Sequence, residues 1–566
     1  ENQTLNIELK VPSDVQQLQE VSVNAVKEND NITSSGMNVT KFDPKSIETI
    51  PVIFGEKDIM KTLQLMPGVK SAGEGNAGFY VRGGGADQNL ILLDEAPVYN
   101  ASHLLGFFSV FNSDAIKDVS LYKSGIPAEY GGRCSSVMDV KMRDGNNKKF
   151  GASGGLGLIS SRLTLEGPIV KEKGSFIISG RRSYADLFLK LQDDETLKDT
   201  KLFFYDLNAK ANYKISEKDR IFLSGYFGRD KFGLGEDFGF SWGNATGTLR
   251  WNHLINKKLF SNTTVVYSNF NYEFNIGSGD ESFGVRSSIQ DWNLKQDFSY
   301  YLNSNNTLKF GVNGIHHTFK PGALTGSNET FNEIVLDSQY AIELGAYIQN
   351  EMKIGSRLNV MYGLRYSGFN LMGEGKSFEF DEQGDKISET SYESWETIQY
   401  HQGLEPRFSA GLILTENNSI KFGYNRNLQY LHQLSNTTTS SPTDVWVPSS
   451  KNVKPQIADQ VALGYYQNLK KNMYRISTEV YYKNLQNQID YRNGAELVLN
   501  NEVEGELVYG KGRTFGIELL VEKKKGKFTG WISYTLSRSL RTFDQIDEGK
   551  EFSAKQDRIH DLSIVM

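Results

Sequence analysis

The chain has 566 residues, a formal net charge of −6, 12% aromatic residues and only 38% hydrophobic residues. The acidic balance excludes the basic surface that nucleic-acid binding requires, and the single cysteine excludes an internal disulfide bond. No stretch approaches the roughly 18 consecutive apolar residues of a membrane-spanning helix, whereas a transmembrane β-barrel combines many aromatics with few apolar residues, because only alternate strand residues face lipid.

The first forty residues predict one strand followed by a linker. Residues 3–11 alternate polar and apolar side chains up to Pro12, so residues 1–12 are expected to be the last strand of an upstream β-sandwich-like domain. Residues 13–40 are mostly polar and are expected to be a linker, interrupted by a short alternating segment at 18–25. That segment suits either strand addition to a partner's sheet edge or an ordinary linker.

Residues 41–147 predict a small mixed α/β domain. A helical apolar face over residues 56–66 ends at Pro67-Gly68. Short strands separated by turns are expected at 79–82, 89–93, 117–123 and 136–142.

From residue 148 to residue 566, apolar residues recur at every second position, which predicts one large antiparallel sheet. Short turns, as at 216–219, alternate with long connections, as at 371–404 and 432–455. Periplasmic turns and extracellular loops alternate in this way in outer-membrane barrels, and the runs are longer than typical sandwich strands. We expect about sixteen or seventeen strands.

The sequence offers no pattern for catalysis, metal binding or a cofactor. No H-E-x-x-H motif occurs, and His316 and His317 point to opposite faces of a strand, so they cannot chelate one metal together. Residues 73–78 fit G-x-G-x-x-G but lead into a strand instead of a helix, which argues against a dinucleotide site.

Four blocks resemble the plug of the TonB-dependent receptors, especially the Bacteroidetes-type branch with an upstream carboxypeptidase-regulatory-like domain. They are DIMKTLQLMPGV at 58–69, VRG at 81–83, NLILLDEAPVY at 89–99 and PAEYGGR at 127–133. The resemblance spans essentially the whole chain and implies a transmembrane β-barrel of about 22 strands occluded by a mixed α/β plug. Because the sequence ends in mid-strand, we expect C-terminal strands to be missing from it.

The resemblance implies active import across the bacterial outer membrane, without a cofactor or a chemical reaction. A TonB-type periplasmic energy coupler would pull on the segment at 18–25, with Leu18, Glu20, Val21, Ser22 and Val23 as the coupling residues. A passive porin or adhesive barrel is one alternative, and a barrel enzyme is another. Outer-membrane lipid and a surface lipoprotein lid, which larger relatives possess, are further expected partners.

In the family, two plug arginines meet two barrel glutamates. The matching arginines are Arg82 and Arg133, and Glu518 points inward by strand alternation. The second family acid falls near the neutral Gln460, so Glu479 is the expected substitute. The alternative is that Arg82 pairs with an ordinary plug carboxylate.

The external ligand is expected to meet the plug apex and the long loop. Aromatic faces with a few polar groups suit glycans, peptides and metal chelates alike, so the ligand class stays open. Phe107 and Phe108 have packing against the wall as an alternative role. The expected ligand-binding residues are Tyr99, His103, Phe107, Phe108, His432 and Trp446.

Overall fold

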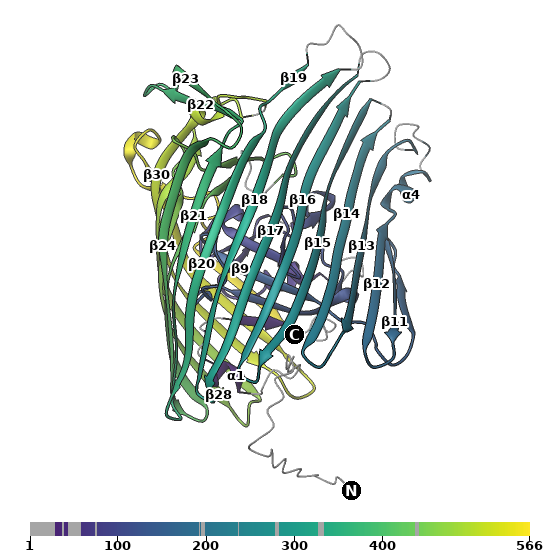
Figure 1. Cartoon of the computed structure of the whole chain (residues 1–566), viewed down its shortest axis with the longest axis vertical. Coiled ribbons are helices and arrows are strands. Elements are labelled where there is room, and N and C mark those ends of the chain that lie inside the picture. The colour runs from purple at the N-terminus through teal and green to yellow at the C-terminus, as the bar shows by residue number, and fades with distance from the viewer. Residues whose placement is uncertain are drawn as a thin grey trace.

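The structure is a computed structural model in which a wide β-barrel encloses a small N-terminal domain (Figure 1). The strand expected at 1–12 and the alternating segment at 18–25 lie outside the described part of the chain. The structure describes residues 29–34, 36, 39–42, 58–73, 76–191, 193, 198–235, 237–277, 282–326, 333–435, 441–497 and 499–566.

The enclosed domain, here the plug, is built on a five-stranded sheet in the order β1-β8-β9-β4-β5, in which β4 and β9 run parallel. Asp58 caps helix α3 (Ile59–Leu63), because its carboxylate accepts the amides of Met60 and Lys61. The strands are β1 (Val39–Phe42), β4 (Asn89–Leu93), β5 (Ala96–Pro97), β8 (Ile116–Tyr122) and β9 (Ser136–Met142). Two small hairpins join them, β2 (Val69–Ser71) with β3 (Phe79–Val81) and β6 (Ser102–His103) with β7 (Phe108–Ser109).

In the described residues the barrel is one antiparallel sheet of twenty strands, which follow one another along the chain from β10 at one edge to β33 at the other. The two-residue strands β19 and β32 pair only with β18 and β31, which also pair with β20 and β33. The predicted fold class is therefore confirmed. The strands are β10 (Gly151–Leu156), β11 (Ser160–Val170), β12 (Gly174–Ser183), β13 (Lys201–Lys214), β14 (Asp219–Leu234), β15 (Phe238–Asn256), β16 (Leu259–Ile276), β17 (Phe283–Asn303), β18 (Asn306–Gly326), β19 (Ile334–Val335), β20 (Gln339–Ile354), β21 (Leu358–Met372), β24 (Thr397–Thr415), β25 (Asn418–Gln429), β28 (Gln456–Leu469), β29 (Tyr474–Tyr491), β30 (Leu507–Lys523), β31 (Gly530–Phe543), β32 (Phe552–Ser553) and β33 (His560–Val565).

The sequence underestimated the number of strands for a physical reason. Strands β19 and β32 have two residues each, too few to show a period. Strand β10 reads GASGGL and has no apolar alternation at all, although it pairs with β11 over its whole length.

Further elements stand at the ends of the barrel. Hairpin β22 (Gly375–Phe380) with β23 (Lys386–Tyr392) and helix α4 (Ala185–Leu189) lie at the end with the long connections, and helix α1 (Asp30–Thr33) lies at the other end (Figure 1). A second hairpin, β26 (Leu431–Leu434) with β27 (Val445–Pro448), is largely buried. No helix in the described residues is long and apolar enough to cross a membrane.

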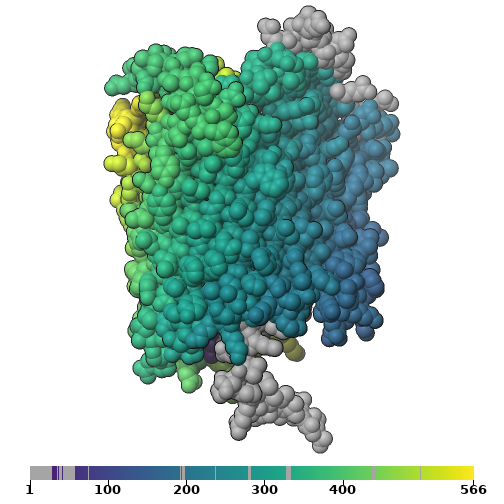
Figure 2. Space-filling view, in the orientation of Figure 1, coloured from purple at the N-terminus to yellow at the C-terminus, as the bar shows by residue number. Residues whose placement is uncertain are grey.

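Polar and apolar side chains alternate between the two faces of the wall. Along strand β16, the face that carries the apolar side chains changes from the outside to the inside. In the middle of β16, Val265 faces outward and Thr264 is buried inside. Towards the long-connection end, Phe270 and Tyr272 are buried on the inside, and the polar Asn271 between them faces out. On the face seen in Figure 2, the wall hides almost all of the plug.

Candidate ligand pocket and plug–barrel contacts

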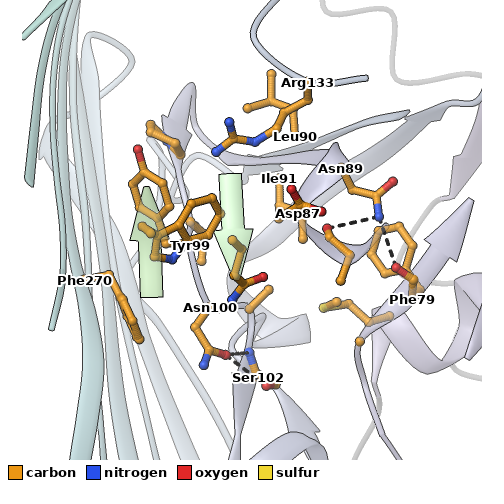
Figure 3. Close-up of a pocket in the computed structure, with 18 of the residues that line it drawn as sticks. Phe79, Asp87, Asn89, Leu90, Ile91, Tyr99, Asn100, Ser102, Arg133 and Phe270 are labelled. Atoms are coloured by element: carbon orange, nitrogen blue, oxygen red, sulfur yellow. Dashed lines mark hydrogen bonds between the residues drawn. The ribbon is translucent and has the colours of Figure 1, made fainter. Parts of the chain in front are cut away.

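A cavity of about 780 Å³, part of it open to solvent, lies between the top of the plug, the wall and hairpin β26–β27 (Figure 3). We call it the apex pocket. Its aromatic and polar lining residues include Phe79, Tyr99, Phe270, Trp446, Asn76, Asn89, Asn100, Gln433, Asp87 and Arg133.

The β4–β5 turn brings Tyr99 into the pocket. Both turn residues, Asp94 (φ 44°) and Glu95 (φ 74°), have left-handed backbone that residues other than glycine adopt at a cost. The barrel anchors this turn, because Lys210 lies 3.0 Å from the Asp94 carboxylate and Lys295 lies 2.8 Å from the Glu95 carboxylate.

Contacts with the wall and the hairpin fix the Tyr99 side chain. Its hydroxyl donates to Asp291 of β17 at 2.5 Å, and the other Asp291 oxygen lies 2.7 Å from His317 Nδ1. Its ring meets the Trp446 ring edge to face, with 5.1 Å between centroids. The pocket is therefore built jointly by the plug, the wall and hairpin β26–β27.

Two of the six expected ligand-binding residues, Tyr99 and Trp446, line the apex pocket. Phe107 is 57% exposed outside it, and Phe108 is buried against Phe204 of β13. His432 is buried in hairpin β26–β27 and lies within hydrogen-bond distance of Ser449 and Gln456.

His103 also lies away from the pocket, in a contact between plug and wall. Its Nδ1 is 2.6 Å from Asp230, its Nε2 is 3.4 Å from Asp206, and its ring stacks on Phe204. Burial lowers the pKa of His103, but the two carboxylates outweigh it, so the pKa is raised. A histidine held by two wall acids serves docking, which sequence alone could not distinguish from ligand binding.

The plug is held to the wall by a buried ionic cluster. Arg82 Nε lies 2.8 Å from Glu518 of β30, and Arg82 Nη2 lies 2.7 Å from Glu479 of β29. Both carboxylates and the arginine side chain are almost fully buried. Arg82 thus reaches both barrel acids, and an ordinary plug carboxylate is not its partner.

Two plug glycines permit this approach. Gly68 has φ +76°, and a Cβ there would lie 2.0 Å from Glu518 Oε1. Gly83 has φ +70°, and a Cβ there would lie 2.7 Å from the Thr514 methyl. Any side chain at these positions would collide with strand β30.

The second cation of the cluster is Lys123, which the sequence analysis missed. Its Nζ lies 2.7 Å from Glu518 Oε2, and the side chain is buried. Gln460, the neutral residue near the second family position, donates to the Lys123 carbonyl. The sequence contained a signal for this position, because Val119, Leu121 and Lys123 occupy every second position along β8 and just past its end. In the structure all three are buried.

Arg133 corrects the sequence prediction, because it does not pair with Glu479 or Glu518. Among the described residues its guanidinium lies over the Trp446 ring, 5.3 Å from the centroid, and its Nη1 donates to the Gly132 carbonyl. The loop before it docks on a different part of the wall, where Ala128 donates to Gln349 of β20. The backbone therefore carries Arg133 to the apex pocket.

A second cavity of about 900 Å³ lies above hairpin β26–β27, nearer the long connections. It shares Trp446 with the apex pocket and is richer in aliphatic residues, including Leu336, Leu371 and Ile398. Lys376 of the exposed hairpin β22–β23 stands at its edge.

The segment just before the plug docks on the wall at the opposite end of the barrel. Ile32 of α1 is buried, and Asn31 donates to Asn468 of β28 at 2.7 Å. Lys421 of β25 donates to Ser34 Oγ and to the Gly36 carbonyl. We call the described residues 29–34 and 36 the entry segment.

Family models match both parts of the chain. Residues 181–559 match the TonB dependent receptor-like, beta-barrel family, and residues 31–136 match the TonB-dependent Receptor Plug Domain. The chain belongs to the TonB-dependent receptors. As a TonB-dependent receptor it is a protein of the bacterial outer membrane, with the long connections outside and the entry segment at the periplasmic end.

Solved structures similar to this TonB-dependent receptor share its fold at low identity. The copper transporter OprC is 11% identical with a TM-score of 0.67, and 92% of this chain and 82% of that chain are covered. The siderophore receptor PirA from Pseudomonas aeruginosa is 13% identical with a TM-score of 0.61, and 89% of this chain and 85% of that chain are covered. The FrpB iron transporter from Neisseria meningitidis (F3-3 variant) is 14% identical with a TM-score of 0.65, and 92% of this chain and 84% of that chain are covered. Among curated proteins no sequence is significantly similar.

Proposed function

We propose that this receptor actively imports an organic ligand that binds in the apex pocket, and that a TonB-type coupler drives the import by pulling on residues 18–25. The observation that carries the proposal is the buried ionic cluster of Arg82, Lys123, Glu479 and Glu518. Separating buried charges is unfavourable, so the plug stays in place until work is done on it.

The position of the entry segment supports the same mechanism. The entry segment lies between the expected pulling point and the plug, and it is attached to β25 and β28 of the wall. A pull from the periplasm therefore loads these contacts first. Contacts of this kind are weak singly and can open in sequence.

The ligand is proposed to be organic and not a bare metal ion. The described residues contain no group of three or more histidine, cysteine, aspartate or glutamate side chains that could hold a metal. The pocket instead offers aromatic faces and amides. A Bacteroidetes-type upstream domain and a surface lipoprotein lid are proposed from the sequence resemblance alone.

The test replaces residues 18–25 by eight alternating glycines and serines, which keeps the length of the chain. The compound that copurifies with the protein is identified by mass spectrometry, and its uptake and binding are then measured. We expect uptake to be lost and binding to be kept. Replacement of residues 13–17, which lie in the expected linker, by alternating glycines and serines is the control.

The alternatives give different outcomes in this experiment. A passive porin or an adhesive barrel would keep its uptake or attachment after the replacement. An enzyme would convert the compound and would lose that turnover on substitution of one side chain. Either result would overturn the import proposal.

A further inference from the structure

Arg133 lies at the rim of the apex pocket, and most of its hydrogen-bond donors have no acceptor among the described residues. Figure 3 shows its guanidinium group turned into the pocket, on the side of Tyr99. In the described part of the chain, its five N–H groups make one hydrogen bond, from Nη1 to the Gly132 carbonyl at 3.1 Å. Stacking on Trp446 occupies one face of the group and leaves its donor edge available.

Asp87, the one acid among the described lining residues, forms no ion pair with Arg133. Asp87 lies beyond ion-pair distance of it, and Gln429 Nε2 already donates to the Asp87 carboxylate at 2.8 Å. Burial raises the pKa of Asp87, against the opposing effect of Arg133. Burial therefore favours the uncharged form of this carboxyl group.

The remaining lining is neutral. Among the described lining residues Arg133 is the one cation, and the polar groups around it are mainly amides, such as those of Asn89 and Asn100. Tyr99, Phe270 and Trp446 add aromatic surface. A guanidinium group beside aromatic rings, with no carboxylate partner among the described residues, suits a ligand that brings its own negative charge.

We propose that Arg133 is the specificity-determining residue of the apex pocket, and that it binds the oxyanion, a carboxylate or a phosphate, of a ligand whose ring system packs against Tyr99 and Trp446. This inference rests on the proposed function in taking the apex pocket as the ligand site. It assigns to Arg133 a role that its place in the sequence motif does not suggest, since Lys123 has taken its place beside Glu518.

The test compares three ring ligands on the full-length protein in detergent. 2-Naphthoate and 2-naphthyl phosphate carry the charge, and 2-naphthamide is the neutral control. Their affinities are measured by isothermal titration calorimetry, with ligand-observed NMR for weak binding. A charge-assisted hydrogen bond predicts that wild type prefers at least one charged ligand over the amide by about tenfold or more.

Three variants locate the effect. Arg133→Gln is expected to reduce that preference to less than about twofold while amide binding persists. Arg133→Lys keeps the charge without the planar fork and is expected to retain part of the preference. Lys376→Gln removes a cation from the second cavity and is the matched control, expected to leave the preference unchanged.

Three results would contradict the role proposed for Arg133. Equal affinities in wild type, a preference that survives in Arg133→Gln, or a preference lost equally in Lys376→Gln would each overturn the assignment. The replacement of residues 18–25 leaves these affinities untouched, so failure of this inference can be distinguished from failure of the import mechanism.

Discussion

Arg82 of the plug and Glu518 of strand β30 are 436 residues apart in the sequence, and their side chains meet at 2.8 Å inside the barrel. Glu518 also accepts from Lys123, so one carboxylate holds two plug cations. This makes Glu518 the residue on which docking of the plug depends most.

Glu518→Gln should loosen the plug without unfolding the barrel. Removing one partner from a buried ionic cluster destabilises by about 3–5 kcal/mol, because the remaining charges are left uncompensated. Hydrogen exchange of the β4 and β9 amides should therefore accelerate about a hundredfold or more. Glu522→Gln on the same strand, where the carboxylate is 29% exposed and lies 3.9 Å from Arg475 and 3.8 Å from Lys524, is the control. Unchanged exchange in Glu518→Gln would contradict the prediction.

Lys123→Met should also loosen the plug, and its effect should depend on Glu518. In a double-mutant cycle with Glu518→Gln, we expect a coupling of about 1–3 kcal/mol, because the two residues share one contact. Lys117→Met on strand β8 serves as the control and should add independently. An additive result for Lys123 and Glu518 would show that the 2.7 Å contact contributes nothing to docking.

The His103 contact should make docking sensitive to pH. The pKa of His103 is raised in the folded protein, since Asp230 and Asp206 outweigh the effect of burial. The stabilisation is therefore complete below the unfolded value of about 6.5 and is lost as pH rises through the folded pKa. The difference in thermal stability between wild type and His103→Gln should be largest near pH 6 and should shrink towards alkaline pH. A difference in thermal stability that grows as the pH rises would contradict the prediction.

Lys421→Met should release the entry segment. Its ammonium donates to Ser34 and Gly36, so the substitution removes two contacts of about 1 kcal/mol each. Exchange of the amides in the entry segment should become about tenfold faster or more, and that of β4 should not change. Lys470→Met, in a turn at the same end of the barrel, is the control. Equal protection in both variants would show that the entry segment is held by other contacts.

Local patterns predicted much of the fold. Strands β4 and β9 have the bounds expected from the sequence, and the period of two identified the large sheet. Alternation also placed Glu518 on the inside, where it is 2% exposed. These features depend on neighbouring residues, so a sequence contains them directly.

The contacts across the lumen could not be predicted in the same way. Whether Arg133 or Lys123 stands opposite Glu518 depends on how a loop of the plug is seated on a wall formed hundreds of residues later. The motif around Arg133 suggested the wrong partner, because Gly131-Gly132 carries that residue towards Trp446 instead. The contact of His103 with the wall could not be predicted for a related reason, since Asp206 and Asp230 become its neighbours only in the folded barrel.

The reversal of polarity along β16 has a consequence for the part of the receptor outside the bilayer. The strand continues for about eight residues beyond the reversal, a rise of roughly 25 Å if it stood upright. Over that height this part of the wall is polar on the outside and carries aromatic side chains on the inside. We therefore expect an incoming ligand to lose part of its hydration on these aromatic side chains, above the level of the hydrocarbon and before the plug moves.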